Sequence, residues 1–215
     1  MQSNFVHVID DDDSLRNAIV LILQEAGYQV KDWASAQSFL ESSNKIDNSV
    51  IFLDLQMPIL TGLGLISHLN QSDMNIQVVF ISGNAVPSEV VSAFNQGASD
   101  FLLKPFDMDM LLAAAEKAMQ TIHKNVHQKA TAGALMAKFN TLTRREKVLL
   151  EPLVSGGKIR DIAAQLDLAE ITVKVYKAKI MRKLGVSSLS ELIVFSQSLN
   201  LSSTTDHKIS NTRTQ

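Results

Sequence analysis

The sequence contains no cysteine, so this chain can form neither a disulfide nor a thiolate metal site. No stretch reaches the roughly 18 consecutive apolar residues that a membrane-spanning helix needs, and we therefore expect no membrane span. The first charged residues are acidic, and no basic segment precedes an apolar one near the N-terminus, so we expect no signal peptide. Together these absences make a cytoplasmic protein the default expectation.

The composition is that of an ordinary soluble protein, with 46% hydrophobic and 20% charged residues in a chain of 215. The net charge of −2 conceals an asymmetry. Residues 1–140 hold eight basic and fifteen acidic residues, a net charge of −7, whereas residues 141–200 hold ten and six, a net charge of +4. This asymmetry indicates two domains with different partners, and nucleic acid is a candidate partner of the basic one.

The first 120 residues alternate between strand-like and helix-like segments. Between the strands lie segments with helical periodicity, such as 14–26, whose apolar residues share one face and which Gly27 ends. Strands that alternate with helices predict a parallel sheet with helices on both faces. The expected strands are Phe5–Ile9, Tyr28–Trp33, Val50–Leu53, Ile76–Ile81 and Asp100–Leu103.

Residues 141–200 carry no strand signal and predict four helices. Thr143–Glu146 and Ser188–Glu191 have the spacing of capping boxes, which begin the first and the fourth helix. Gly156 and Gly157 end the first helix. We expect the second helix at Ile159–Leu166, the third at Glu170–Leu184 before Gly185, and the fourth to end near Asn200.

Two further segments complete the predicted organisation, and no internal repeat is present. Residues 107–122 predict the last helix of the first domain. Residues 123–140 have weak periodicity and are interpreted as a linker that continues this helix in part. The tail, residues 201–215, is rich in Ser, Thr and Asn and is predicted to be disordered.

Polar side chains follow four of the predicted strands. The acidic run Asp10–Asp13 follows the first strand, and Asp54, Ser82 and Lys104 follow the third, fourth and fifth. The carboxyl ends of parallel strands form one edge of the sheet, where open sheets bind ligands. Each residue alone is typical of a loop, a helix cap or a turn. Their joint placement predicts a crevice that holds carboxylates, a hydroxyl and an ammonium group.

Three carboxylates in one crevice repel each other and stay ionised together only when a cation binds. Oxygen ligands without Cys or His favour a hard ion such as Mg²⁺. A carboxylate beside a metal, a hydroxyl and a Lys suits an in-line attack on a phosphoryl group. The product would be an acyl phosphate on Asp54.

At these positions the chain resembles a bacterial two-component response regulator. The motifs that carry the resemblance are V-I-D-D-D at 8–12, L-D-L-Q-M-P at 53–58, T-G at 61–62, I-S-G at 81–83 and D-F-L-L-K-P-F at 100–106. The resemblance implies a receiver domain over 1–122, with a flavodoxin-like, doubly wound, five-stranded parallel sheet. Residues 141–200 resemble the all-α, four-helix LuxR-type helix-turn-helix domain of the FixJ/NarL regulators.

The resemblance assigns roles in the receiver. It implies that Asp54 is the phosphoacceptor and that Mg²⁺ is held by Asp54, by Asp11 directly, by Asp10 through water and by the backbone carbonyl of Gln56. Further residues are implied in phosphoryl binding, in the conformational switch or in tuning dephosphorylation. They are Ser82 and Lys104 for phosphoryl binding, Ser82 and Phe101 for the switch, and Gln56 and Asn84 for dephosphorylation. The peptide bond between Lys104 and Pro105 is often cis in such receivers.

The third helix of the basic domain has two distinct sides. Val173, Ile180 and Leu184 cluster within about 20° on a helical wheel and should face the core. Lys177 lies toward that side as well, where its stem can pass along the packed surface to water. The opposite side mixes basic and small apolar residues, as a face in the DNA major groove can. Its members are Ile171, Lys174, Val175, Ala178 and Arg182.

The motifs L-T-R-R-E at 142–146, I-A at 162–163, T-V-K at 172–174 and K-L at 183–184 match LuxR-type domains. By this match Lys174, Val175 and Ala178 would reach base edges, and Thr172, Tyr176 and Lys179 would contact the DNA backbone, with Arg182 on the same surface. The chain departs from the family at three positions. Ile159 replaces the usual Asn, Ala169 the usual Ser that caps the third helix, and Tyr176 the usual His.

These features together predict a phosphorylation-controlled transcription factor and not an enzyme. A histidine kinase would phosphorylate Asp54, the receiver would dimerise, and the basic domains would bind promoter DNA. The three departures leave open a regulator whose helical domain binds a protein instead of DNA. A Mg²⁺ phosphatase of the haloacid-dehalogenase type is a further alternative, but Gln56 stands where such enzymes need a second Asp.

Overall fold

The computed structural model describes residues 4–42, 46–72 and 74–210, with side chains described as far as Leu199. The chain forms two compact units, Met1–His127 and Gln128–Gln215. Within the described residues, no helix combines the length and the apolar character that crossing a membrane requires.

The first unit contains a five-stranded parallel sheet with the strand order β2-β1-β3-β4-β5. Every predicted strand is confirmed to within one residue at each end. The chain moves outward in opposite directions from β1 and β3, so the edge beyond these two strands is a topological switch point, where such sheets bind ligands. The strands are β1 Phe5–Ile9, β2 Gln29–Trp33, β3 Ser49–Asp54, β4 Ile76–Ser82 and β5 Asp100–Leu103.

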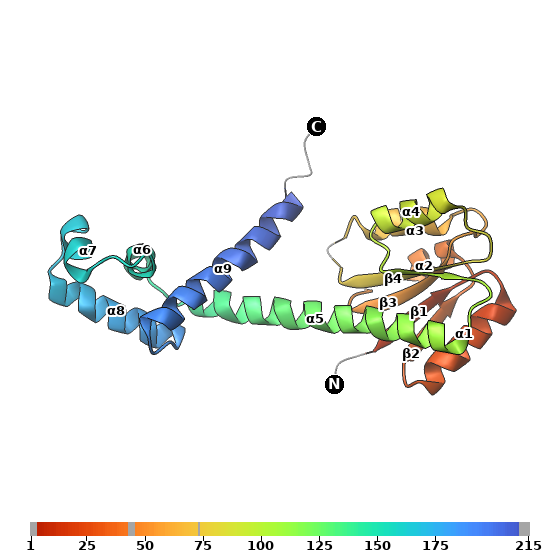
Figure 1. Cartoon of the computed structure of the whole chain (residues 1–215), viewed down its shortest axis with the longest axis horizontal. Coiled ribbons are helices and arrows are strands. Elements are labelled where there is room, and N and C mark those ends of the chain that lie inside the picture. Colours follow the sequence, from red (N-terminus) through yellow and green to blue (C-terminus); the bar gives the residue numbers. More distant parts are fainter. Residues whose placement is uncertain (1–3, 43–45, 73, 211–215) are drawn as a thin grey trace. The chain divides into compact units, whose positions relative to one another are not determined.

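Helices cover both faces of this sheet, as Figure 1 shows. Helices α1 (Asp13–Glu25) and α5 (Met108–Asn140) pack on one face, against Val50 and Phe52 of β3. The opposite face packs against Ile51 and Leu53. It is covered by α2 Ala36–Ser42, α3 Gly62–Leu69 and α4 Pro87–Asn95. Strand β3 is therefore buried on both sides, which explains its uninterrupted apolar sequence.

Helix α5 is longer than the sequence predicts, because the expected linker 123–140 is helical along its whole length. This segment contains no proline, and Gly133 is its only glycine, so nothing in it breaks the helix. Contacts within the first unit fix the helix just past the predicted boundary. Asn125 Nδ2 donates to Asn75 Oδ1 at 2.8 Å, and Asn75 Nδ2 donates to the Ile122 carbonyl at 3.1 Å.

The second unit consists of helices around one core, which the end of α5 joins through Leu135 and Phe139. Val173, Ile180 and Leu184 are fully buried there, as the helical wheel predicts. The four predicted helices of the basic domain are confirmed. They are α6 Arg144–Val154, α7 Ile159–Gln165, α8 Glu170–Leu184 and α9 Leu189–Ser210.

Capping boxes were predicted at the starts of α6 and α9. At α6 the capping box is confirmed, because Thr143 Oγ1 accepts from the Glu146 amide and Glu146 Oε2 accepts from the Thr143 amide. At α9 only half of the box forms. Ser188 Oγ accepts from the Glu191 amide at 3.1 Å, but the Glu191 carboxylate accepts from Ser187 instead of Ser188.

The predicted end of α9 near Asn200 is wrong, since the helix continues to Ser210. The expectation of a disordered tail is thereby corrected for residues 201–210. Neither glycine nor proline occurs between 189 and 210, so helical hydrogen bonding can run on without a break. Residues 211–215, the remainder of the predicted tail, lie outside the described residues.

Candidate functional site

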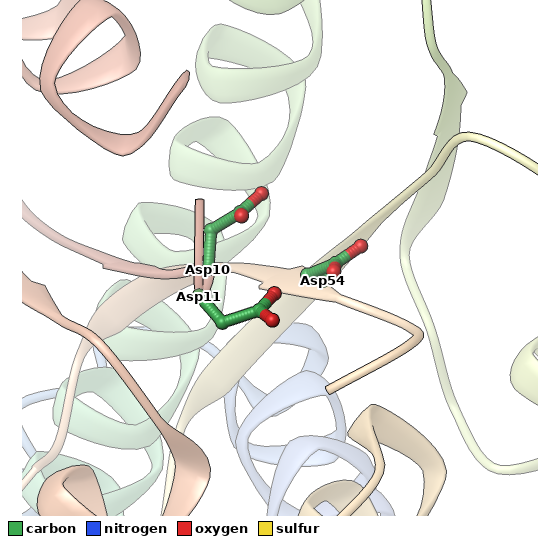
Figure 2. Close-up of side chains that lie close together, drawn as sticks. All are labelled: Asp10, Asp11 and Asp54. Atoms are coloured by element: carbon green, nitrogen blue, oxygen red, sulfur yellow. The ribbon is translucent and has the colours of Figure 1, made fainter. Parts of the chain in front are cut away.

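Three carboxylates lie together at the carboxyl edge of the sheet. Asp10 and Asp11 directly follow β1, and Asp54 is the last residue of β3. One oxygen from each side chain lies within 4.8 Å of the others, and Figure 2 shows the three side chains beside each other. Asp10 and Asp54 are 1% and 5% exposed, whereas Asp11 is exposed. The cluster is therefore mostly buried, and Asp11 connects it to solvent.

Lys104 brings a positive charge into this cluster from the residue after β5. Its Nζ lies 3.0 Å from Asp10 Oδ2 and 3.4 Å from Asp54 Oδ1. Burial raises the pKa of Asp54; Lys104 opposes this rise, and the charges of Asp10 and Asp11 add to it, so that the pKa stays above its ordinary value. Burial lowers the pKa of Lys104, but the two carboxylates outweigh burial and raise it.

Ser82 and Phe101 lie on the adjacent strands β4 and β5, where Ser82 pairs with Leu103 and Phe101 pairs with Phe80. Ser82 ends β4, is fully buried, and accepts a hydrogen bond from the Asn84 amide at 3.4 Å through its Oγ. Because Asp54 pairs with Ile81, the Ser82 hydroxyl group lies on the strand adjacent to Asp54 and one position beyond it. Phe101 is half-buried against Phe80, with 6.3 Å between the ring centroids. The fold thus brings Asp10, Asp11, Asp54, Ser82 and Lys104 to one edge of the sheet, whereas Phe101 lies two residues before the end of β5.

The loop after Asp54 approaches the strand too closely for a side chain at Gly62. A Cβ atom there would lie 2.5 Å from the Asp54 carbonyl oxygen. Gln56, in the same loop, is exposed, and its Nε2 donates to the Asn84 carbonyl at 3.3 Å, which ties the loops after β3 and β4 together. The Lys104–Pro105 peptide bond is cis, as the resemblance implies.

The residues of this pocket fit a magnesium ion by their chemistry. All three clustered side chains offer carboxylate oxygens, the ligands that Mg²⁺ prefers, and no sulfur or imidazole takes part. Their mutual repulsion across less than 5 Å favours a bound cation, because Lys104 supplies only one positive charge.

In the second unit, helix α8 presents the predicted basic face to solvent. The side chains of Thr172 and Tyr176 are half-buried at its margin, and Lys177 is half-buried toward the core side. Ala169 stands at the N-cap in extended conformation and makes no side-chain capping bond, so the first turn of α8 lacks the usual cap. The exposed residues of this face are Ile171, Lys174, Val175, Ala178, Lys179 and Arg182.

A cleft between the start of α6 and one side of α8 adds residues that the sequence prediction missed. Arg144 and Arg145 open α6 and line this cleft. Their sequence signal was the pair of adjacent arginines in the first turn of α6, directly after the N-cap Thr143. The complete lining is Thr143, Arg144, Arg145, Glu146, Tyr176, Lys179, Arg182 and Lys183.

Glu146 is the only carboxylate that lines this cleft, and it is 3% exposed. Its Oε2 accepts from Lys183 Nζ at 2.6 Å and from the Thr143 amide at 2.7 Å. Burial raises the pKa of Glu146, but Lys183 and the Thr143 amide outweigh burial and hold it below its ordinary value. The carboxylate therefore fixes the start of α6 against the end of α8.

Comparison with known proteins matches both units. Residues 6–116 match the model of the response regulator receiver domain, and residues 140–196 match that of bacterial regulatory proteins of the luxR family. Nodulation protein W of Bradyrhizobium diazoefficiens is 34% identical over 197 residues, 92% of this chain and 87% of that protein. The transcriptional regulatory protein FixJ of Azorhizobium caulinodans is also 34% identical, over 87% of this chain and 89% of its own length.

The chain belongs to the FixJ/NarL-type response regulators. The structure of the response regulator StyR is similar over 90% of this chain and 98% of that one, with a TM-score of 0.80 at 34% identity. Full-length FixJ from B. japonicum matches over 94% and 99%, with a TM-score of 0.59 at 29% identity. This response regulator is therefore a DNA-binding transcription regulator, and the protein-binding alternative for its second unit is not favoured.

Proposed function

We propose that this response regulator accepts a phosphoryl group on Asp54 from a sensor histidine kinase, dimerises, and then binds promoter DNA. The observation that carries the proposal is the mostly buried cluster in which carboxylate oxygens of Asp10, Asp11 and Asp54 lie within 4.8 Å of one another and Lys104 contacts two of them. Carboxylates this close together repel one another, and such an arrangement is typical of a site that binds a cation and performs chemistry.

In the proposed reaction an oxygen of Asp54 forms the new bond to phosphorus. The bond from phosphorus to the donor's nitrogen or oxygen breaks, and the leaving group keeps that electron pair. The Lys104 ammonium and the Ser82 hydroxyl then bind phosphoryl oxygens. A Mg²⁺ ion held by Asp10, Asp11, Asp54 and the Gln56 carbonyl would supply the positive charge that the incoming phosphoryl oxygens need.

The phosphoryl group changes the charge of the pocket and so shifts a two-state equilibrium of the receiver. We infer that Ser82 moves toward the phosphoryl group and that Phe101 repacks, which alters the surface of α4, β5 and α5 and favours a dimer. Val91, Phe94 and Leu103 are exposed apolar residues of that surface and support its role as an interface.

DNA binding is assigned to the exposed face of α8 and to the basic cleft beside it. Lys174, Val175 and Ala178 would contact base edges, whereas Thr172, Tyr176, Lys179 and Arg182 would contact the phosphate backbone. Two such domains in a dimer would contact half-sites about one helical turn apart. A protein that acts on promoter DNA works where the chromosome lies, so a cytoplasmic location is part of the proposal.

The test is fluorescence anisotropy of the full-length protein with a pooled library of promoter DNA. Binding is measured with and without acetyl phosphate and Mg²⁺, each at two salt concentrations, and the phosphorylated fraction is read by mass. The proposal expects tighter, salt-dependent binding only with the phosphodonor, because phosphate contacts release counterions. Absent DNA binding, although Asp54 is phosphorylated by mass, would instead support a regulator that acts through a protein partner.

A further inference from the structure

Arg16 is a buried cation beside the carboxylate pocket to which the sequence prediction gave no role. It lies in the first turns of α1, and only 10% of its side chain is exposed. It shares the buried side of this helix with Ile19 and Leu23. An arginine at the i, i+3 and i+7 spacing of an apolar stripe is the sequence signal for this position.

The guanidinium group of Arg16 joins three segments at the edge of the sheet. Its Nη1 donates to the Asp10 carbonyl oxygen at 2.7 Å, and its Nε donates to Asp32 Oδ2 at 3.0 Å. Its Nη2 donates to the carboxylate of Asp13, the first residue of α1. Because the guanidinium group is planar and its donors are fixed relative to one another, these contacts hold β1, β2 and α1 in one arrangement.

Other contacts hold Asp10 from its remaining sides. The Asp10 amide donates to the Trp33 carbonyl at 3.2 Å, and Asp10 Oδ1 accepts from the Asp12 amide at 2.8 Å. Asp10 Oδ2 accepts from Lys104 Nζ at 3.0 Å. The Asp10 carbonyl is the remaining polar group of this residue, and Arg16 is its partner. Arg16 thus completes the fixation of the turn that carries Asp10 and Asp11.

We propose that Arg16 is a positioning residue for a divalent cation bound by Asp10, Asp11 and Asp54. This inference rests on the proposed function. The hydrogen bonds of Arg16 go to the backbone carbonyl of Asp10 and to the carboxylates of Asp13 and Asp32, and not to the clustered carboxylates themselves. Arg16 holds the turn in the geometry that the cation needs, as supporting residues of metal sites do.

Charge and positioning predict opposite effects, which makes the inference testable. A positive charge near the pocket repels a cation, so removal of the Arg16 charge alone would tighten Mg²⁺ binding. Loss of the positioning contacts would loosen the turn and weaken Mg²⁺ binding. Arg16→Gln removes both the positive charge and the planar set of guanidinium donors. Arg16→Lys keeps the charge and removes only that set of donors.

The experiment titrates the full-length protein and its variants with Mg²⁺ and follows the fluorescence of Trp33, the single tryptophan of the chain. Free Mn²⁺, which also prefers oxygen ligands, is measured in parallel by electron paramagnetic resonance, a signal that does not depend on Trp33. We expect the dissociation constants of Arg16→Gln and Arg16→Lys to rise about tenfold. Asp32→Asn, which removes one of the three contacts, should give a smaller rise.

The control variant is Lys117→Gln, which removes an exposed ion pair with Asp100 in the same unit and should bind both ions like the wild type. Circular dichroism in EDTA verifies that each variant is folded. If Arg16→Gln does not fold, Arg16→Lys and Asp32→Asn carry the test. Unchanged or tighter binding in the folded Arg16 variants overturns the positioning role alone. A wild-type protein that binds neither ion overturns the proposed pocket as well as this inference.

Discussion

The acidic pocket of the receiver and the basic cleft of the helix-turn-helix unit are built on the same plan with opposite charges. In the receiver, three carboxylates cluster together and two of them bind Lys104. In the cleft, four residues with cationic side chains besides Lys183 line a wall that contains Glu146. Each cluster of like charges thus contains one group of opposite charge that pairs with part of it. The remaining net charge, negative in the receiver and positive in the cleft, is free to attract a partner of opposite charge.

The two sites differ in burial, and the difference reflects the size of their partners. Asp10 and Asp54 are nearly inaccessible, so only a small cation can reach and balance their negative charge. Arg144, Lys179 and Arg182 are exposed, so water and salt screen their repulsion until a large polyanion arrives. Burial therefore selects a small partner, and exposure permits DNA.

The largest effect is expected when the phosphoryl acceptor, Asp54, is removed from the acidic cluster. Asp54→Ala should abolish phosphoryl incorporation from acetyl phosphate, because the attacking oxygen is lost. The measurement is the mass of the intact protein after incubation with the phosphodonor and Mg²⁺. Asp100→Ala, which removes a carboxylate outside the pocket, should incorporate phosphate normally. Labelling that persists in Asp54→Ala would refute the assignment of the acceptor.

The second prediction removes the single carboxylate of the basic cleft. Glu146→Gln should lower the free energy of unfolding by about 2 kcal/mol, less than for a fully buried pair because the Lys183 side chain is partly exposed to water. Urea unfolding at neutral pH measures this loss. Glu191→Gln, which alters a solvent-exposed carboxylate at α9, should change the midpoint less.

The pH dependence of this loss has a definite sign. Because the pKa of Glu146 is lowered in the folded protein, its contribution is fully present above the carboxyl pKa of the unfolded chain. The contribution disappears as the pH falls through the lowered folded value. The difference between wild type and Glu146→Gln should therefore shrink in acid. A difference that grows as the pH falls would contradict the role of the ionised pair.

The third prediction concerns the excess positive charge of the cleft. Lys179→Ala should weaken DNA binding about three- to tenfold and reduce the slope of log affinity against log salt by about one, because one phosphate contact is lost. Anisotropy titrations at several salt concentrations measure both. Lys117→Ala removes the same charge from the receiver and should leave the slope unchanged. Equal slopes for Lys179→Ala and wild type would exclude Lys179 from the interface.

The smallest effect is expected when the missing N-cap of α8 is restored. Ala169 has the extended backbone of an N-cap but no side-chain acceptor. Ala169→Ser should stabilise the second unit by about 1 kcal/mol, because the hydroxyl can accept from a free amide of the first turn. Urea unfolding detects this gain, and Ala169→Val, which also lacks an acceptor, serves as the control. A serine variant no more stable than the wild type and the valine variant would contradict the capping explanation.

Much of the fold follows from local pattern. Alternation of apolar runs with helical periods located all five strands to within one residue, and Gly185 marked the end of α8. Errors arose where no residue forces a boundary. Residues 123–140 and 201–210 contain no proline, and both continue a helix that the sequence prediction ended or left partial. The weak periodicity of 123–140 predicted only a partial continuation of the helix, and the Ser, Thr and Asn content of the tail predicted disorder.

The sequence by itself determined the edge at which the candidate site forms, because Asp54, Ser82 and Lys104 each stand at the end of a strand. Only the tertiary structure decided which charges meet. Lys104 reaches Asp10 across 94 positions of sequence, and Lys183 reaches Glu146 across 37. Period and propensity act over a few neighbouring residues, whereas such pairs depend on how distant elements pack. For the same reason Arg16 acquired its partners, and with them its proposed role, only in the folded chain.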